Sequence, residues 1–183
     1  MMGFRAPESW QTAEIPGPKK ALVITKPEVV TALIKRAKRP IMLVGHRAVE
    51  VKLKNGLLID YLIRIAELGG IPVVATAHIQ GEFQKRGFKV ESWMPLMDIA
   101  NRLSDPDWMG LDGEGQYDLL LIAGYQYYLA WLVLSGLKHF SQNLKTVSID
   151  MYYQPHASWS FPNLKVEDWE VNLNRIIEGL GGE

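Results

Sequence analysis

Four apolar runs of the sequence each end in residues that could bind a nucleotide. These end segments are Gly45-His46-Arg47, Thr76-Ala77-His78, Gly124-Tyr125 and Asp150-Met151. Glycine permits close approach of the backbone to a ligand, the guanidinium of Arg47 pairs well with phosphate, and the carboxylate of Asp150 could accept hydrogen bonds from a ribose or a base. The pattern therefore predicts a nucleotide site where two of these segments meet. The structural alternative is a plain strand-to-helix turn, with Arg47 paired to Glu50 on the surface.

The common phosphate-binding and catalytic signatures do not occur in the sequence. It contains no GxGxxG, no GxxxxGK[ST] and no GxSxG motif, which argues against a Walker-type site and against a nucleophile elbow. The four histidines are scattered singly, without HxxxH or HExxH spacing: His46, His78, His139 and His156. We therefore expect no metal site, although His46 and His78 could still converge at neighbouring strand ends.

Composition excludes several further classes of function. The 183-residue chain has no cysteine, so thiolate catalysis, disulfides and cysteine-ligated iron–sulfur clusters require another chain. Lysine plus arginine equals aspartate plus glutamate at 20 each. Because the net charge is zero, the chain has no overall positive potential to attract phosphate groups. We therefore expect neither nucleic acid nor an anionic membrane surface as a partner.

Residues 119–137 contain no charged side chain and approach the length of a membrane-spanning helix. Gly124 divides this run, Gln126 is polar, and its aromatic residues lie in the middle rather than at interfacial ends. We interpret the run as a buried strand followed by a partly buried helix. Because residues 1–20 lack a basic segment followed by an apolar one, we predict no secretion signal and a cytoplasmic location.

Apolar periodicity predicts an α/β fold, with a Rossmann-like parallel sheet covered by helices on both faces. The expected strands are residues 41–44, 71–75, 117–123 and 146–149. The expected helices are residues 25–38, 58–68, 94–103, 125–140 and 168–180. The first strand, helix and second strand have the length of a βαβ crossover, so these strands should be parallel. Ligands bind such sheets at the carboxyl ends of the strands, where strand order reverses; the Gly45 and Gly124 segments would face one another there if their strands are neighbours.

The two ends of the chain are expected to differ in order. Residues 1–24 are rich in proline and predict an extended arm, which either lies against a partner or is a frayed terminus. Residues 25–183 are expected to form a single domain. Thr25 is the expected N-cap of the first helix, with Glu28 completing a capping box.

Two loop features are also expected. Residues 76–90 lack a clear period and predict a long loop that could carry function. Several aromatic residues fall in loops, where they could be either interface anchors or core residues: Trp10, Trp108, Tyr152, Tyr153 and Trp159.

Two passages support a resemblance to a known fold: residues 38–45 (KRPIMLVG) and residues 68–76 (LGGIPVVAT). With residues 117–124 and 145–150, they resemble the deoxyhypusine-synthase-like NAD/FAD-binding fold of thiamine-diphosphate enzymes and electron-transfer flavoproteins. Within it, the whole chain is similar to the epsilon subunits of archaeal acetyl-CoA decarbonylase/synthase complexes. That similarity includes the tryptophan-bearing arm and residues 150–154 (DMYYQ).

The resemblance implies a partner, the nickel–iron–sulfur alpha subunit of a carbon monoxide dehydrogenase component that interconverts CO and CO2. For the chain itself it implies either stabilisation of that subunit, without catalysis, or FAD-linked electron transfer. The flavin contacts carried over from the fold are Gly45, His46, Arg47, Thr76, Gly124, Tyr125 and Asp150. Arg47 stands where flavoproteins of this fold often have a second glycine. An accessory subunit is the favoured interpretation and self-association of the isolated chain stays open, whereas a free-standing nucleotide enzyme lacks an identifiable base and nucleophile.

Overall fold

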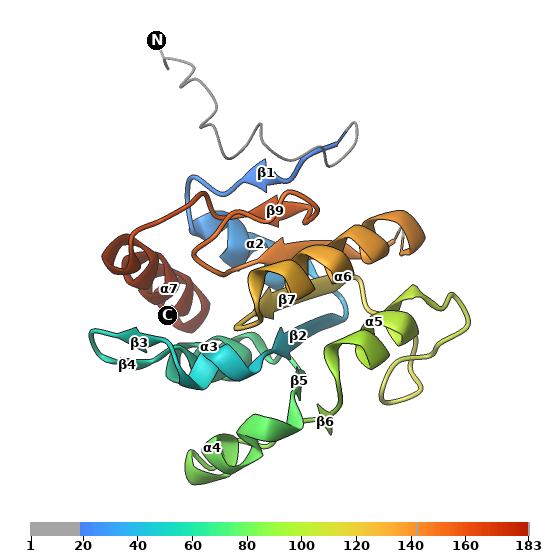
Figure 1. The fold of residues 1–183 in the computed structure, drawn as a ribbon, viewed down its shortest axis with the longest axis horizontal. Coiled ribbons are helices and arrows are strands. Elements are labelled where there is room, and N and C mark those ends of the chain that lie inside the picture. Colours follow the sequence, from blue (N-terminus) through green and yellow to red (C-terminus); the bar gives the residue numbers. More distant parts are fainter. Residues whose placement is uncertain (1–18, 142, 183) are drawn as a thin grey trace.

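A parallel sheet forms the centre of the fold. The computed structural model describes residues 19–141 and 143–182. Within them, seven strands lie in the order β1-β9-β8-β7-β2-β5-β6, and every neighbouring pair is parallel (Figure 1). The strands are β1 (Leu22–Val23), β2 (Pro40–Val44), β5 (Val73–Ala75), β6 (Ser92–Trp93), β7 (Leu119–Ala123), β8 (Lys145–Ser148) and β9 (Trp159–Ser160). A separate antiparallel hairpin pairs β3 (Lys52–Leu53) with β4 (Gly56–Leu57).

Helices cover both faces of this sheet. They are α2 (Glu28–Arg36), α3 (Leu58–Gly69), α4 (Gln80–Lys85), α5 (Leu96–Ser104), α6 (Tyr127–Phe140) and α7 (Val166–Gly181), with short 3-10 turns η1 (His46–Val49) and η2 (Ala77–Ile79). Successive strand residues point to opposite faces. Ile41 and Leu43 accordingly pack with α5 and α6, whereas Met42 and Val44 pack with α2, α3 and α7. A central strand buried on both sides explains the continuous apolar run.

The predicted α/β class and the parallel sheet with helices on both faces are confirmed. The narrower assignment to the deoxyhypusine-synthase-like fold stays a prediction. β2 lies between β5 and β7 and is parallel to both. The predicted parallel orientation of the first two strands is confirmed, and the first and third strands are neighbours. The chain runs from β2 outward to β5 and β6, then returns to β7 on the other side of β2. The order therefore reverses between β2 and β7.

The prediction of a long loop over residues 76–90 is wrong, because this segment contains η2 and α4. Phe83 of α4 is buried in the core and packs edge-on against Trp93, with ring centroids 5.7 Å apart. A helix of six residues is too short for its period to stand out in the sequence.

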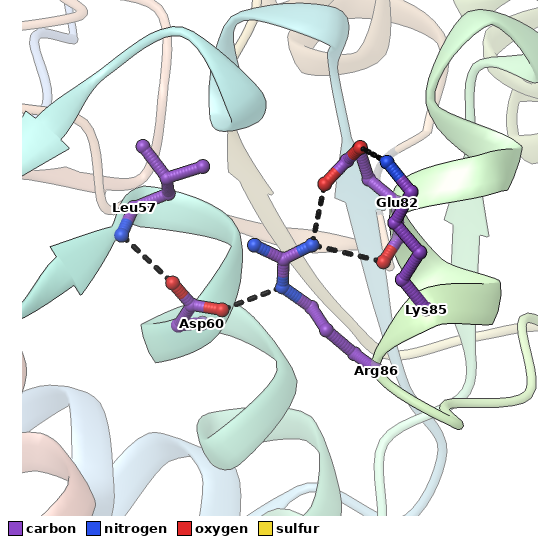
Figure 2. Close-up of polar contacts among 5 residues, drawn as sticks. All are labelled: Leu57, Asp60, Glu82, Lys85 and Arg86. Atoms are coloured by element: carbon purple, nitrogen blue, oxygen red, sulfur yellow. Dashed lines mark hydrogen bonds and ion pairs between the residues drawn. The ribbon is translucent and has the colours of Figure 1, made fainter.

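An ion-pair network around Arg86 ties α4 to α3 (Figure 2). The Nε of Arg86 donates to Oδ1 of Asp60 at 2.5 Å, and its Nη1 donates to the carbonyl and to Oε2 of Glu82 at 2.9 and 2.7 Å. The other oxygen of Asp60 accepts the Leu57 N–H at 2.7 Å. Burial raises the pKa of Asp60, but the hydrogen bonds from Arg86 and Leu57 outweigh it, so the pKa lies below its ordinary value.

Two other predictions of local structure need correction. Thr25 does not cap the first helix: α2 begins at Glu28 with Pro27 at the N-cap position and no side-chain cap. The strands of two residues, such as β6 and β9, were not predicted, because so short a pairing leaves no alternating pattern to detect.

Residues 1–18 of the predicted arm lie outside the described residues. The rest of the predicted arm includes β1, whose Leu22 and Val23 pair with Trp159 and Ser160 of β9. The division into an arm and one domain stays a prediction. Among the helices of residues 19–141 and 143–182, none has both the length and the apolar character needed to cross a membrane.

Candidate functional site

The carboxyl ends of β2 and β7 meet at two glycines. The Gly45 N–H donates to the Ala123 carbonyl, and the Arg47 N–H donates to the Gly124 carbonyl, each at 2.9 Å. Gly124 has φ +75°, a left-handed conformation that favours glycine. A Cβ on Gly45 would lie 2.2 Å from the carbonyl oxygen of Gly124. The glycines therefore let two segments of the chain pack against each other.

Asp150, which follows β8, completes this corner. Its carboxylate oxygens accept the Gly124 N–H at 3.0 and 3.2 Å. Burial raises the pKa of Asp150 to about 6, although the hydrogen bond from Gly124 and the positive charge of Arg47 act in the opposite direction. Burial, and then the negative charge of Asp150, raise the pKa of the Tyr125 hydroxyl. That hydroxyl has no hydrogen-bond partner among the described residues and stays neutral at physiological pH.

The raised pKa of Asp150 predicts a pH-dependent stability. Because the folded protein holds this proton more tightly than the unfolded chain does, ionisation of Asp150 destabilises the fold as pH rises from about 4 through about 6. Asp150→Asn keeps an oxygen to accept the Gly124 N–H but carries no charge. Since Asp150 is only partly buried, we expect the variant to gain about 1 to 2 kcal/mol over the native chain between pH 4 and pH 7.5. Urea unfolding at both pH values measures this difference, and parallel pH profiles would contradict it.

A small cavity opens beside this corner, with a volume of about 40 Å³. Small-molecule pockets usually measure about 300–1,000 Å³, so the cavity has room for water rather than for a nucleotide. The N–H groups of Gly45, Arg47 and Gly124, which would face a pyrophosphate, already donate within the chain. On both grounds the corner does not fit a flavin dinucleotide.

Four of the predicted site residues line the cavity together: Arg47, Gly124, Tyr125 and Asp150. Gly45 takes part through its contact with Gly124. Thr76 and His46 are not among the lining residues. The Thr76 N–H donates to the Val44 carbonyl at 3.2 Å, and its buried hydroxyl has no hydrogen-bond partner among the described residues. A ligand-binding role for the seven residues stays a prediction.

Residues that sequence reasoning did not assign to the site also line the cavity: Val51, Tyr127, Met151, Tyr152, Gln154 and Trp169. The side-chain amide of Gln154 donates to the Tyr127 carbonyl at 3.1 Å. The Trp169 indole N–H donates to the Ile149 carbonyl at 2.8 Å. Residues 150–154 were noted for their family resemblance, which was a usable signal for Met151, Tyr152 and Gln154. Trp169 comes from the closing helix α7, and nothing local in the sequence connects it to the sheet.

The histidines take separate places in the fold. His46 is partly buried in η1, whereas His78 in η2 and His139 near the end of α6 are exposed. His156 is buried and packs edge-on against Trp131, with centroids 4.5 Å apart. Within the part of the chain that the structure describes, no three acidic or histidine side chains gather as a metal site would require.

The aromatic residues that were expected in loops differ in burial. Tyr153 is buried, and its hydroxyl donates to the Ala21 carbonyl at 2.8 Å. Trp108 and Trp159 are partly buried against the two cores. Tyr152 is 47% exposed, and its role as an interface anchor stays a prediction. Trp10 lies outside the described residues.

Comparison with known proteins gives one consistent match. The family described as "CO dehydrogenase beta subunit/acetyl-CoA synthase epsilon subunit" matches residues 3–177. The acetyl-CoA decarbonylase/synthase complex subunit epsilon of Methanothermobacter thermautotrophicus is 39% identical over 167 residues, which cover 91% of this chain and 92% of the relative. The Methanothrix soehngenii subunit is 36% identical over 95% of this chain and 91% of its own length. Subunit epsilon 1 of Archaeoglobus fulgidus is 38% identical over 97% and 92%. The chain therefore belongs to the family of CO dehydrogenase beta subunits and acetyl-CoA synthase epsilon subunits.

Proposed function

We propose that the chain is a non-catalytic accessory subunit of the carbon monoxide dehydrogenase component of an acetyl-CoA decarbonylase/synthase complex. In this role it docks in the cytoplasm on the nickel–iron–sulfur alpha subunit and stabilises it. The observation that carries the proposal is the similarity, over 91% of the chain, to a protein named as subunit epsilon of such a complex.

Two chemical features support this role. The sequence has no cysteine, so the thiolate ligands of an iron–sulfur cluster must come from another chain. At the β2–β7 corner, the Gly124 N–H donates to the carboxylate of Asp150, and the Arg47 N–H donates to the Gly124 carbonyl. These hydrogen bonds hold the ends of the two strands together.

Co-purification and thermal stability test the proposal. The tagged full-length chain, produced in its native host and purified without oxygen, is expected to bring the alpha subunit with it in stoichiometric amount, as identified by mass spectrometry. Purified alpha subunit should then melt at higher temperature when the chain is added. At a free concentration 100-fold above Kd, binding stabilises the partner by about 2.7 kcal/mol. A solitary chain, or an unchanged melting temperature, would contradict the proposal.

The flavin-linked alternative is tested with the same purified chain. Because the corner has a cavity of only about 40 Å³, we expect the absorbance spectrum of FAD to stay unchanged when the chain is added at tens of micromolar. A stoichiometric spectral change would favour an electron-transfer subunit instead.

A further inference from the structure

The outer surface of α6 is largely apolar and carries no charged side chain before Lys138 in its last turn. Four of its residues, spaced four apart, form a row that we call the α6 ridge: Tyr128, Leu132, Gly136 and Phe140. Tyr128 is 59% exposed, Leu132 is 52% exposed and Phe140 is 75% exposed. The opposite side of the helix is already used, because its residues pack on the sheet. The ridge therefore faces away from the core of this chain.

Other helices present a different surface. The exposed residues of α7 include Glu167, Asp168, Arg175 and Glu178, and those of α2 include Lys35 and Arg36. In α6, by contrast, the first charged side chain is Lys138, in the last turn. A surface helix without charges for most of its length is unusual in a chain that is 22% charged, and an apolar patch of this kind is typical of a binding surface.

Packing among the described residues does not explain why residue 136 is glycine. A glycine inside a helix destabilises the helix relative to alanine. Its presence is explained if another molecule approaches the helix backbone closely at this position. A Cβ placed on Gly136 would meet no atom within 4 Å. The nearby Leu132 projects from the same row, so the ridge offers a protrusion and a hollow one helical turn apart.

The ridge ends at a pocket of about 220 Å³. Phe140 lines this pocket with Trp108 and Tyr117, and the charged Arg102 and Asp105 line it as well. The rings of Trp108 and Tyr117 lie 5.9 Å apart at a tilt of 49°. This volume is below the usual size of a cofactor site. Aromatic residues around a pocket beside an apolar surface commonly receive one anchoring side chain of a protein partner.

We infer that the α6 ridge is the docking surface for an uncharged, apolar helix of the alpha subunit. The inference rests on the proposed function, which supplies the partner. The absence of charge on Tyr128, Leu132 and Gly136 determines what can bind there: a charged group buried against these residues would lose its hydration without gaining a counter-charge from them. Rows of residues four apart fit the grooves of a second helix, and Leu132 and Gly136 provide a protrusion and a hollow for that contact.

Two substitutions test the ridge in the full chain. Gly136→Leu fills the hollow, its Cβ has no atom of the described residues within 4 Å, and leucine is the better helix former. The melting temperature of the free chain should therefore rise by about 2 °C, while the affinity for purified alpha subunit falls at least about tenfold. A structural role for Gly136 would instead lower the melting temperature. Leu132→Asp should weaken the same binding to at least that extent, with the circular dichroism spectrum unchanged.

Val171→Asp is the matched control, because Val171 is 50% exposed on α7. It should bind the alpha subunit like the native chain. If Leu132→Asp and Gly136→Leu also bind normally, the α6 assignment is overturned while the accessory role stands. If the native chain binds no alpha subunit, both are overturned. Should the ridge variants alter only self-association in sedimentation experiments, the ridge would belong to a second copy and the inference would be wrong.

Discussion

Gly45→Ala is expected to destabilise the protein by about 3 kcal/mol. The added Cβ would lie 2.2 Å from the carbonyl oxygen and 2.6 Å from the carbonyl carbon of Gly124. Both are backbone atoms, so no flexible side chain can move aside. Relief requires β2 and β7 to separate at the point where the Gly45 N–H donates to the Ala123 carbonyl. The substitution therefore strains the centre of the sheet.

Urea unfolding and thermal melting measure this effect. For a domain of this size, a loss of about 3 kcal/mol lowers Tm by about 6–12 °C. Gly81→Ala is the control: Gly81 lies in α4, and its added Cβ meets nothing within 4 Å. That variant should be unchanged or more stable by up to about 1 kcal/mol. Equal stability of the two variants would show that the glycine contact is not tight.

Glu170→Ala is expected to cost about 3 kcal/mol, because it removes the acceptor for three donors. The buried carboxylate of Glu170 accepts the Lys54 N–H at 2.9 Å, the Asn55 N–H at 3.2 Å and the Tyr61 hydroxyl at 2.6 Å. These bonds attach the β3–β4 hairpin and α3 to α7. Burial, followed by the hydrogen bond to Glu170, raises the pKa of Tyr61 to about 12. Tyr61 therefore remains a hydroxyl donor at physiological pH.

The same cluster predicts the direction of a pH effect. The hydrogen bond from Tyr61, with those from the two backbone N–H groups, lowers the pKa of Glu170. A carboxylate with a lowered folded pKa stabilises the protein above its ordinary pKa, and this contribution is lost as pH falls through the folded value. Glu170→Gln retains an acceptor but cannot titrate, so it should cost less than Glu170→Ala.

Thermal melting between pH 3 and pH 7 tests both parts of this prediction. The native chain should lose stability below about pH 4.5, and Glu170→Gln should lose less over the same interval. Identical profiles for the native chain and Glu170→Gln would mean that another acidic group dominates the acid unfolding.

The strands that are buried on both faces of the sheet were predicted well from the sequence. Residues 41–44 and residues 119–123 are buried on both faces of the sheet, and such strands are continuous apolar runs in the sequence. Residues 77–85 were misjudged as loop, because η2 and α4 are each shorter than the window in which a helical period can be recognised. Thr25 failed as an N-cap for a different reason: Pro27 occupies that position.

The structure places four of the seven predicted site residues around one cavity, while their ligand-binding role stays a prediction. The rule that ligands bind where strand order reverses correctly brought Arg47, Gly124, Tyr125 and Asp150 to one place. The rule could not show that the N–H groups there already donate within the chain, because these bonds join segments far apart in the sequence: Gly45 to Ala123, Arg47 to Gly124, and Gly124 to Asp150. Sequence reasoning also missed Gln154 and Trp169 as lining residues. Their positions depend on how the final loop and α7 pack on the sheet, which is a contact between distant segments.

The sequence by itself determined the fold class, the parallel orientation of the first two strands and the need for another chain to ligate any iron–sulfur cluster. Each of these depends on local information, namely the apolar period of short segments and the absence of one residue type. Only the tertiary structure decided that Gly45 and Gly124 pack on each other and that Gly136 faces outward on an uncharged ridge. Contacts between distant segments result from the packing of the whole core, which no short stretch of sequence contains.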